Sequence, residues 1–290
     1  MTFGRVLFLL SGLAILMPLI TDIFLPSIPA IALTYGVATG KVQLTLASLF
    51  LGTALGQVIY GPLADRYGRR PVIIITMVIF TAAGFGSAVA PSIEWLNAWR
   101  FLQGLTAASA TIIIRAIVRD LFDGPSATKM LAYTFVTGSI MPIAAPIVGG
   151  YITISVGWEI NMHIIGVTGL LLVVVLWLWL DETGTPEPNA LHLGSMFTAY
   201  KELIRSHRFL IYTFAAIGPF TGLFAILTGL SSVLIEFMNL GPDTFGLLFG
   251  VVMLGNLAAS WLAGRWAETI GSTQLIVSGS LICLISGAAA

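Results

Sequence analysis

Long apolar runs are the feature that most constrains what this chain can fold into. A helix needs about 20 mostly apolar residues to cross the hydrocarbon core of a bilayer. Several runs of that length follow one another, with short polar breaks between them. We predict spans near Val6–Ala32, Val42–Leu63, Val72–Ala90, Ile93–Val118, Met130–Ile154, Ile160–Leu180, Phe209–Ile235, Phe245–Leu262 and Gln274–Ala290. The sequence therefore predicts an all-α polytopic membrane protein with about nine helices.

Composition agrees with a membrane protein and excludes several functional classes. Hydrophobic residues make up 57% of the chain and charged residues only 9%, whereas soluble domains carry roughly 25% charged residues. The net charge of zero provides no basic field for nucleic acid. Cys283 is the only cysteine, which excludes an internal disulfide. The sequence has no phosphate-binding loop, paired-His motif or nucleophile elbow, so we expect no enzyme activity, cofactor or metal site.

The basic residues sort by loop, which predicts the orientation of the chain. Lys41 is almost the only basic residue in one set of alternate connections. The other set contains Arg5, Arg66, Arg69, Arg70, Arg119, Lys129, Lys201, Arg205, Arg208 and Arg265. Because cytoplasmic loops carry an excess of Lys and Arg, this second set and the N-terminus should be cytoplasmic. We expect a multi-pass membrane protein with a cytoplasmic N-terminus.

A long polar stretch divides the chain into two parts. We expect a six-helix bundle over residues 1–180, a cytoplasmic linker over 181–208 and the start of a second bundle over 209–290. A repeat supports this division, because Gly61–Gly68 and Gly264–Gly271 align at the cytoplasmic end of the second span of each bundle. A complete second bundle would need about three further spans. We therefore expect a fragment, a shortened variant or an incomplete gene product.

A basic turn follows the second span and is the most specific motif in the sequence. Gly68 can take a positive φ without steric cost. Asp65 would lie at a helix C-terminus, where a negative charge is unfavourable without a cationic partner. The alternative is an ordinary basic loop that obeys the orientation rule. The candidate functional residues of this turn are Gly61, Asp65, Arg66, Gly68, Arg69 and Arg70.

Two ionisable residues lie inside predicted spans. Asp22 is well inside the first span, where a charge costs roughly 2.5–3.5 kcal/mol on insertion scales, so such residues usually mark a transport pathway or proton relay. Pro18, Pro26 and Pro29 should kink this helix and expose carbonyl groups toward a cavity. The alternative for Asp22 is a structural carboxylate capped by a neighbouring hydroxyl. The alternative for Arg100, in the fourth span, is snorkelling to the outer interface.

The fifth predicted span combines small residues with prolines. Small residues let helices approach closely, and proline loosens a helix. The residues of this candidate functional motif are Gly138, Pro142, Pro146, Gly149 and Gly150. The alternative is generic close packing, because glycine and proline are frequent in membrane helices.

The basic turn resembles the signature loop of the major facilitator superfamily. In that family the loop is a cytoplasmic latch between two bundles, and its acid contacts a helix of the opposite bundle. The resemblance implies that the partner of Asp65 would be the eleventh span, which this sequence does not contain. Glu268 would be the mirror-image acid, near Ser126–Met130. Further segments resemble the bicyclomycin and chloramphenicol–florfenicol resistance subfamily of drug:proton antiporters. These segments are Thr21–Pro29, Val42–Thr45, Gly56–Gln57 and Arg115–Phe122.

The resemblance implies roles for the candidate residues. Asp22 would be the proton-coupling acid, and Arg100 with Gln103 would share a cavity with it as a switchable partner. Arg115 would lie nearer the cytoplasm, with snorkelling as its alternative. The fifth-span motif resembles the antiporter motif, which symporters and uniporters of the superfamily usually lack. The resemblance therefore implies a transporter of the cell inner membrane that exports drugs or small amphipathic compounds in exchange for protons by alternating access. Its partners would be a small drug-like molecule, protons and the lipid bilayer. The alternatives are a metabolite symporter and a truncated fragment that does not transport.

Overall fold

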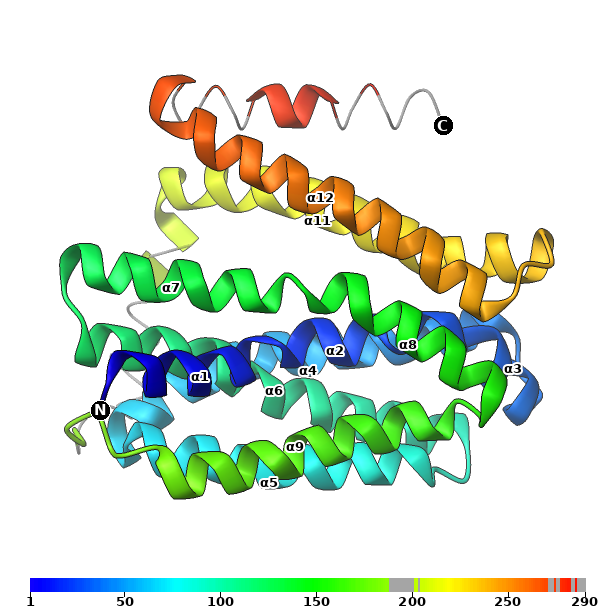
Figure 1. The fold of residues 1–290 in the computed structure, drawn as a ribbon, viewed down its shortest axis with the longest axis horizontal. Helices are drawn as coiled ribbons and strands as arrows, with labels where there is room; N and C mark the ends of the chain where they lie inside the picture. The colour runs from blue at the N-terminus through cyan, green and yellow to red at the C-terminus, as the bar shows by residue number, and fades with distance from the viewer. Residues whose placement is uncertain (188–200, 203, 271–273, 275–276, 283–284, 286–290) are drawn as a thin grey trace. The chain divides into compact units, whose positions relative to one another are not determined.

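The computed structural model describes residues 1–187, 201–202, 204–270, 274, 277–282 and 285, and this part of the chain is helical (Figure 1). Its elements are α1 (Phe3–Ala14), α2 (Leu16–Asp22), η1 (Leu25–Ser27), α3 (Ile28–Tyr35), α4 (Thr39–Tyr67), α5 (Arg69–Ala88), α6 (Ile93–Leu121), α7 (Gly124–Gly138), α8 (Met141–Ser155), α9 (Glu159–Trp179), α11 (His207–Ser231), η2 (Ser232–Phe237) and α12 (Pro242–Ile270).

Among the described residues, seven helical segments are long and apolar enough to cross a membrane. They are Phe3–Tyr35, Thr39–Tyr67, Arg69–Ala88, Ile93–Leu121, Gly124–Ser155, Glu159–Trp179 and Pro242–Ala259. The first six coincide with the six spans predicted for the first bundle, and α11 and α12 occupy the next two. About half of the last predicted span, Gln274–Ala290, lies outside the described residues. The prediction of an all-α polytopic membrane protein is confirmed.

Prolines break two of these spans. Proline has no amide hydrogen, so the carbonyl group four residues earlier loses its helical partner. In the first span, α1 ends at Ala14, four residues before Pro18, and the 3₁₀-helix η1 contains Pro26. In the fifth span, α7 ends at Gly138, four residues before Pro142. The predicted proline kinks are confirmed.

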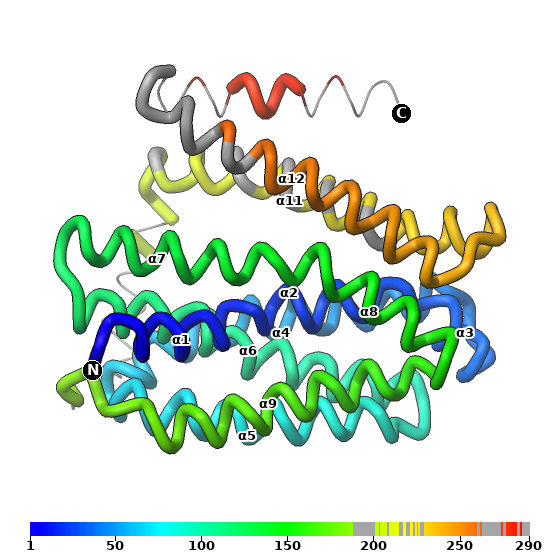
Figure 2. Tube along the Cα trace, viewed as in Figure 1, coloured from blue at the N-terminus to red at the C-terminus, as the bar shows by residue number. Residues whose placement is uncertain are grey.

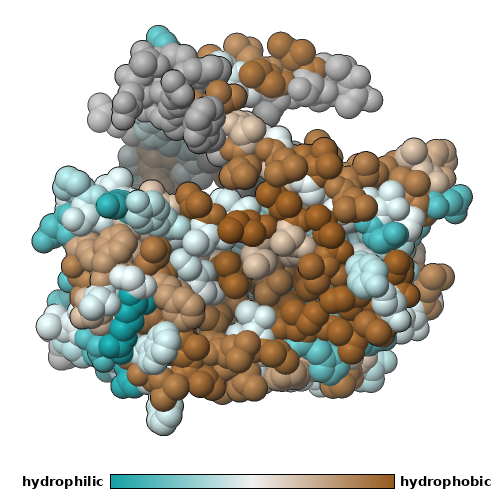
Figure 3. Space-filling model, in the orientation of Figure 1, coloured by the Kyte–Doolittle hydropathy of each residue, from teal (hydrophilic) through white to brown (hydrophobic). Residues whose placement is uncertain are grey.

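The chain forms two compact units. One contains residues 1–191 and 231–250, and the other contains residues 192–230 and 251–290. In the first unit, α4 packs along α6, and α5 packs along α9 (Figure 2). The surface of this unit fits a lipid environment, because Figure 3 shows hydrophobic side chains across the middle of the α1–α8–α9 face and hydrophilic ones toward its edges. Phe8 and Leu171 on this unit are 56% and 60% exposed.

Glycine brings α4 and α6 into backbone contact. A Cβ atom added at Gly104 would lie 1.9 Å from the carbonyl oxygen of Leu49. A Cβ atom added at Gly52 would lie 2.1 Å from the carbonyl oxygen of Phe101. Side chains at these positions would overlap the facing helix, so the crossing depends on glycine.

Gly104→Ala should therefore separate α4 from α6 and lower the stability of the protein by about 1–3 kcal/mol. Thermal unfolding in detergent, followed by size-exclusion fluorescence, measures this loss. Gly61→Ala on α4 is the matched control, because in the described part of the chain no atom beyond its own stretch of helix lies within 4 Å of its added Cβ. Equal unfolding temperatures for the two variants would contradict the glycine-dependent crossing.

Candidate functional site

Asp22 is the last residue of α2, and its side chain is buried. The residue is 6% exposed, and the Thr21 hydroxyl donates a hydrogen bond of 3.0 Å to Asp22 Oδ1. The same hydroxyl lies 2.9 Å from the Met17 carbonyl oxygen and 3.1 Å from that of Pro18. Its single hydrogen can serve only one acceptor at a time. The hydroxyl cap of the structural alternative is thus present, but a neutral cap leaves the charge of an ionised Asp22 uncompensated.

Arg100 is fully buried on α6 and lies against the broken first span. Its Nη2 donates to the Ile20 carbonyl oxygen at 2.7 Å, and its Nη1 donates to Gln103 Oε1 at 2.6 Å. Its Cζ lies 4.6 Å from the centroid of the Phe24 ring, which adds a cation–π contact. Because Arg100 is 0% exposed, its guanidinium group does not snorkel to the outer interface in this structure.

Arg100 and Asp22 do not pair directly in this conformation. Among the described residues, no ion pair within 4.0 Å joins them. Arg100 instead holds the carbonyl group of Ile20, two residues before Asp22. Two buried donors, Arg100 Nε and Gln103 Nε2, have no hydrogen-bond partner in the described part of the chain. A buried carboxyl group at the helix break of the first span thus lies near a buried cation and two donors of α6 that have no partner.

Arg115 does not join this region. It is an exposed residue of α6, and fifteen residues of helix place it about 22 Å from Arg100 along the axis, at 1.5 Å per residue. Its exposed position is the one that the snorkelling alternative requires.

The glycines of the fifth span pack against the broken first span. A Cβ atom added at Gly149 would lie 2.5 Å from the Ile23 carbonyl oxygen, and one at Gly138 would lie 3.3 Å from the Ala14 carbonyl oxygen. The motif thus contacts the first span on both sides of Asp22. Gly150 faces another element, since a Cβ atom there would lie 2.1 Å from the Pro242 carbonyl oxygen.

Pro142 and Pro146 have different places in this motif. Pro142 lies in the first turn of α8, just after the break that follows α7. Pro146 is buried inside α8, and a Cβ atom added at Gly246 of α12 would lie 2.3 Å from its carbonyl oxygen. Pro142 therefore lies at the break between α7 and α8, and Pro146 lies at a close contact between α8 and α12.

A buried polar cluster centred on Asn161 was not predicted. Asn161 Nδ2 lies 3.0 Å from Ser27 Oγ, 3.0 Å from Thr153 Oγ1 and 3.1 Å from the Gly149 carbonyl oxygen. Ser27 Oγ and Thr153 Oγ1 are 2.8 Å apart. The cluster ties η1, α8 and α9 together just beyond Asp22. A polar amide inside an apolar span was the signal that could have revealed it.

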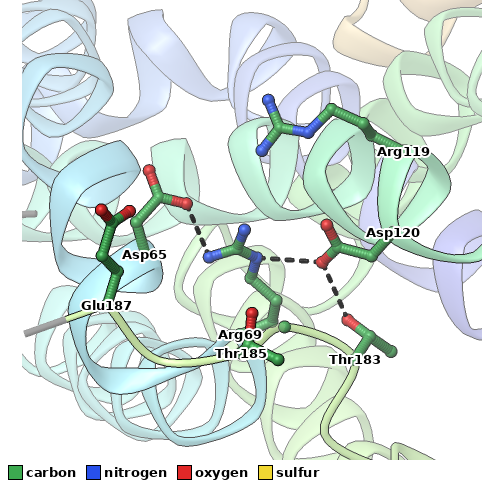
Figure 4. Close-up of a pocket in the computed structure, with 8 residues that line it drawn as sticks. Asp65, Arg69, Arg119, Asp120, Thr183, Thr185 and Glu187 are labelled. Carbon is green, nitrogen blue, oxygen red and sulfur yellow. Dashed lines mark hydrogen bonds and ion pairs between the residues drawn. The ribbon is translucent and has the colours of Figure 1, made fainter.

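Arg69 is the cationic partner of Asp65 in the basic turn. The Arg69 Nη1–Asp65 Oδ1 distance is 2.7 Å, and Arg69 Nε lies 3.1 Å from Asp120 Oδ2 (Figure 4). Gly68 has a φ of +95°, a conformation that suits glycine. The predicted need of Asp65 for a cation is therefore confirmed. Sequence alone did not reveal that Asp120 at the end of α6 shares the cation.

The other turn residues take different positions. The Arg66 guanidinium lies 5.3 Å from the Tyr67 ring. Arg70 Nη2 donates to the Trp177 carbonyl oxygen at 2.8 Å, which anchors the end of α9. Gly61 lies in α4 with open space around it. Glu268 belongs to α12, but its side chain lies outside the described part of the structure, so the predicted latch with Ser126–Met130 stays a prediction.

Glu182, after α9, caps the start of α5 and was also missed by sequence reasoning. Its carboxylate accepts hydrogen bonds from the main-chain amides of Arg69 at 2.8 Å and Arg70 at 3.1 Å. These amides lack helical partners, and a carboxylate near them is favourable. The amides of Thr183 and Gly184 also donate to Glu182, both at 3.1 Å. The start of the linker is therefore folded over the basic turn.

This fold lines an open polar cavity of about 470 Å³. Its lining residues are Asp65, Arg69, Arg119, Asp120, Thr183, Gly184, Thr185 and Glu187 (Figure 4). Three of its charged residues already pair with one another, because Arg69 lies between Asp65 and Asp120 in what we call the Arg69 network. Asp120 also accepts a hydrogen bond from Thr183 of the linker. In the described residues, no group of three or more His, Cys, Asp or Glu side chains could hold a metal ion. We therefore interpret the cavity as a feature of the folded turn and not as a binding site.

Comparison with known proteins identifies a family profile and curated relatives. The profile described as Major Facilitator Superfamily matches residues 10–290. An uncharacterised MFS-type transporter of Bacillus subtilis (strain 168) is 33% identical over 97% of this chain and 71% of its own length. A bicyclomycin resistance protein homolog of Haemophilus influenzae is 30% identical over 96% of this chain and 70% of its length. A chloramphenicol resistance protein of Pseudomonas aeruginosa is 28% identical over 97% of this chain and 66% of its own length.

Solved structures share the fold. The inward-facing, unoccupied bacterial homolog of the human lysosomal transporter Spinster superposes with a TM-score of 0.73, at 18% identity, over 92% of this chain and 63% of that one. A D-xylose–proton symporter superposes with a TM-score of 0.68, at 15% identity, over 92% of this chain and 70% of the symporter. The chain thus spans about two thirds of the length of these relatives and structures.

Proposed function

Because the chain belongs to the major facilitator superfamily, we propose that it exports small amphipathic drugs in exchange for protons. The observation that carries the proposal is Asp22, a buried carboxyl group at a break in the first span with one neutral donor. The bicyclomycin and chloramphenicol resistance relatives support drugs as the class of substrate. The fifth-span glycines support exchange, because they pack on both sides of the segment that carries Asp22.

The residues around Asp22 supply the parts that such an exchange needs. A protonated Asp22 is neutral and suits a buried site, whereas an ionised Asp22 needs a cation or a polar partner. Binding of a drug and binding of a proton would therefore compete at this carboxyl group. Arg100 holds the Ile20 carbonyl oxygen and thereby orients the segment before Asp22. The proline breaks interrupt the regular helical hydrogen bonding of the first span, so the segment with Asp22 can shift during alternating access.

The arrangement in the membrane follows from the same proposal. The inner membrane is the site of action, the N-terminus is cytoplasmic, and residues 181–208 link a bundle of residues 1–180 to a second bundle that begins at residue 209. Asp65 and Glu268 would act as acids of two cytoplasmic gates. The Arg69 network supports this role for Asp65, because it holds the carboxylate at the end of α4.

Proton movement in sealed proteoliposomes tests the proposal. A pH-sensitive dye trapped inside the vesicles reports protons while bicyclomycin, chloramphenicol, florfenicol or a lipophilic cation is added. We expect drug addition to drive proton movement that a protonophore collapses. Counterflow of labelled sugars and organic acids should be absent. Sugar or organic-acid counterflow would indicate a symporter instead, and no proton movement with any drug would overturn the proposal.

A further inference from the structure

An open groove lies between the start of α1 and the end of α9. Its volume is about 600 Å³, and it is lined by Gly4, Arg5, Phe8, Leu178 and Trp179. The large apolar members are exposed, with Phe8 at 56%, Leu178 at 58% and Trp179 at 47%. The Phe8 and Trp179 rings lie 5.7 Å apart between centroids. The groove therefore presents a continuous apolar wall with a cation at one end.

The charged end of the groove contains a carboxylate as well as the cation. Arg5 Nη2 donates to the Trp179 carbonyl oxygen and lies 3.8 Å from Asp181 Oδ2. The side chain of Arg5 is 36% exposed and that of Asp181 is 67% exposed. A pair this long and this exposed is weakly bound. Each of the two groups can therefore accept a further partner of opposite charge.

The groove lies where a bilayer would change from hydrocarbon to headgroups. Phe8 and Trp179 belong to two of the segments that are long and apolar enough to cross a membrane, whereas Asp181 follows the end of α9. Tryptophan and arginine are typical of this interfacial layer. The occupant must therefore be an amphiphile, with an apolar chain for the wall and charges for the Arg5–Asp181 end.

We propose that the groove binds a phospholipid whose headgroup carries both a phosphate and a primary ammonium group, as in phosphatidylethanolamine. The phosphate contacts Arg5, the ammonium group contacts Asp181, and an acyl chain lies along Phe8, Leu178 and Trp179. A purely anionic headgroup fits less well, because it would face the Asp181 carboxylate without a compensating cation. A quaternary ammonium headgroup also fits less well, because it has no N–H to donate to that carboxylate.

Native mass spectrometry of the purified chain tests the site. Phosphatidylethanolamine, phosphatidylcholine and phosphatidylglycerol with identical acyl chains are added in turn. We expect one phosphatidylethanolamine to bind in preference to either of the others. Arg5→Gln should weaken this binding by about tenfold, because a charge-assisted hydrogen bond is lost. Arg66→Gln is the matched control, since Arg66 lies outside the groove over the Tyr67 ring.

Two further variants keep the test decisive if Arg5→Gln loosens the end of α9. Asp181→Asn leaves Arg5 in place and should remove the preference for phosphatidylethanolamine over phosphatidylglycerol. Phe8→Ala should weaken the binding of all three lipids. Equal binding of the three lipids to the unaltered chain would overturn the proposal and indicate only annular lipid. An unchanged preference in Asp181→Asn, or equal losses in Arg5→Gln and Arg66→Gln, would overturn it as well.

Discussion

Replacing Asp22 by Asn should abolish drug-driven proton movement and leave the fold intact. The amide matches the size of the carboxyl group and can still accept the hydrogen bond from the Thr21 hydroxyl. It cannot take up or release a proton in the accessible pH range. We therefore expect the proton flux on drug addition to fall to the level of vesicles without protein. The dye-loaded proteoliposomes described above measure this flux.

Two companion variants separate proton coupling from a general loss of activity. Asp22→Glu keeps a titratable group and should keep coupled exchange with an altered pH dependence. Glu94→Gln removes an exposed carboxylate that pairs with Lys41 at 2.7 Å and should exchange at the unaltered rate. Drug-driven proton movement that persists in Asp22→Asn would show that another group carries the proton.

Arg100→Ala should cost more stability than any other single replacement considered for this protein. It removes the donors to the Ile20 carbonyl oxygen and to Gln103. An orphaned buried acceptor costs about 1–3 kcal/mol, and the vacated volume adds a cavity penalty. We expect a total loss of about 3 kcal/mol or more from these two effects. Thermal unfolding in detergent measures it.

The same helix provides the control for this prediction. Arg115→Ala removes an exposed arginine of α6 and should change stability by less than about 1 kcal/mol. Arg100→Lys keeps the charge but replaces two separate donor nitrogens by one ammonium group, so it should fold but exchange protons more slowly. If Arg100→Ala unfolded at the same temperature as Arg115→Ala, the anchoring of the first span by Arg100 would be contradicted.

The amino-acid sequence by itself determined the spans and their breaks. Each predicted span depends on local hydropathy, which a membrane helix must satisfy within its own residues. The breaks near Pro18 and Pro142 depend on a missing amide hydrogen, which is also a local property. The positive φ of Gly68 belongs to the same class. These features follow from the sequence because no distant residue is needed to produce them.

Only the tertiary structure decided which polar groups meet. Arg100 and Arg115 lie on one helix, yet Arg100 is buried because a broken helix offers it the Ile20 carbonyl group, whereas Arg115 faces outward. Asp65 had three arginines within reach along the sequence, and the position of Asp120 on α6 places Arg69 between two carboxylates. Asn161 and Glu182 were missed for the same reason. Each has a partner far away in the sequence, Ser27 for Asn161 and Arg69 for Glu182, and only the packing of helices brings such groups within hydrogen-bond distance.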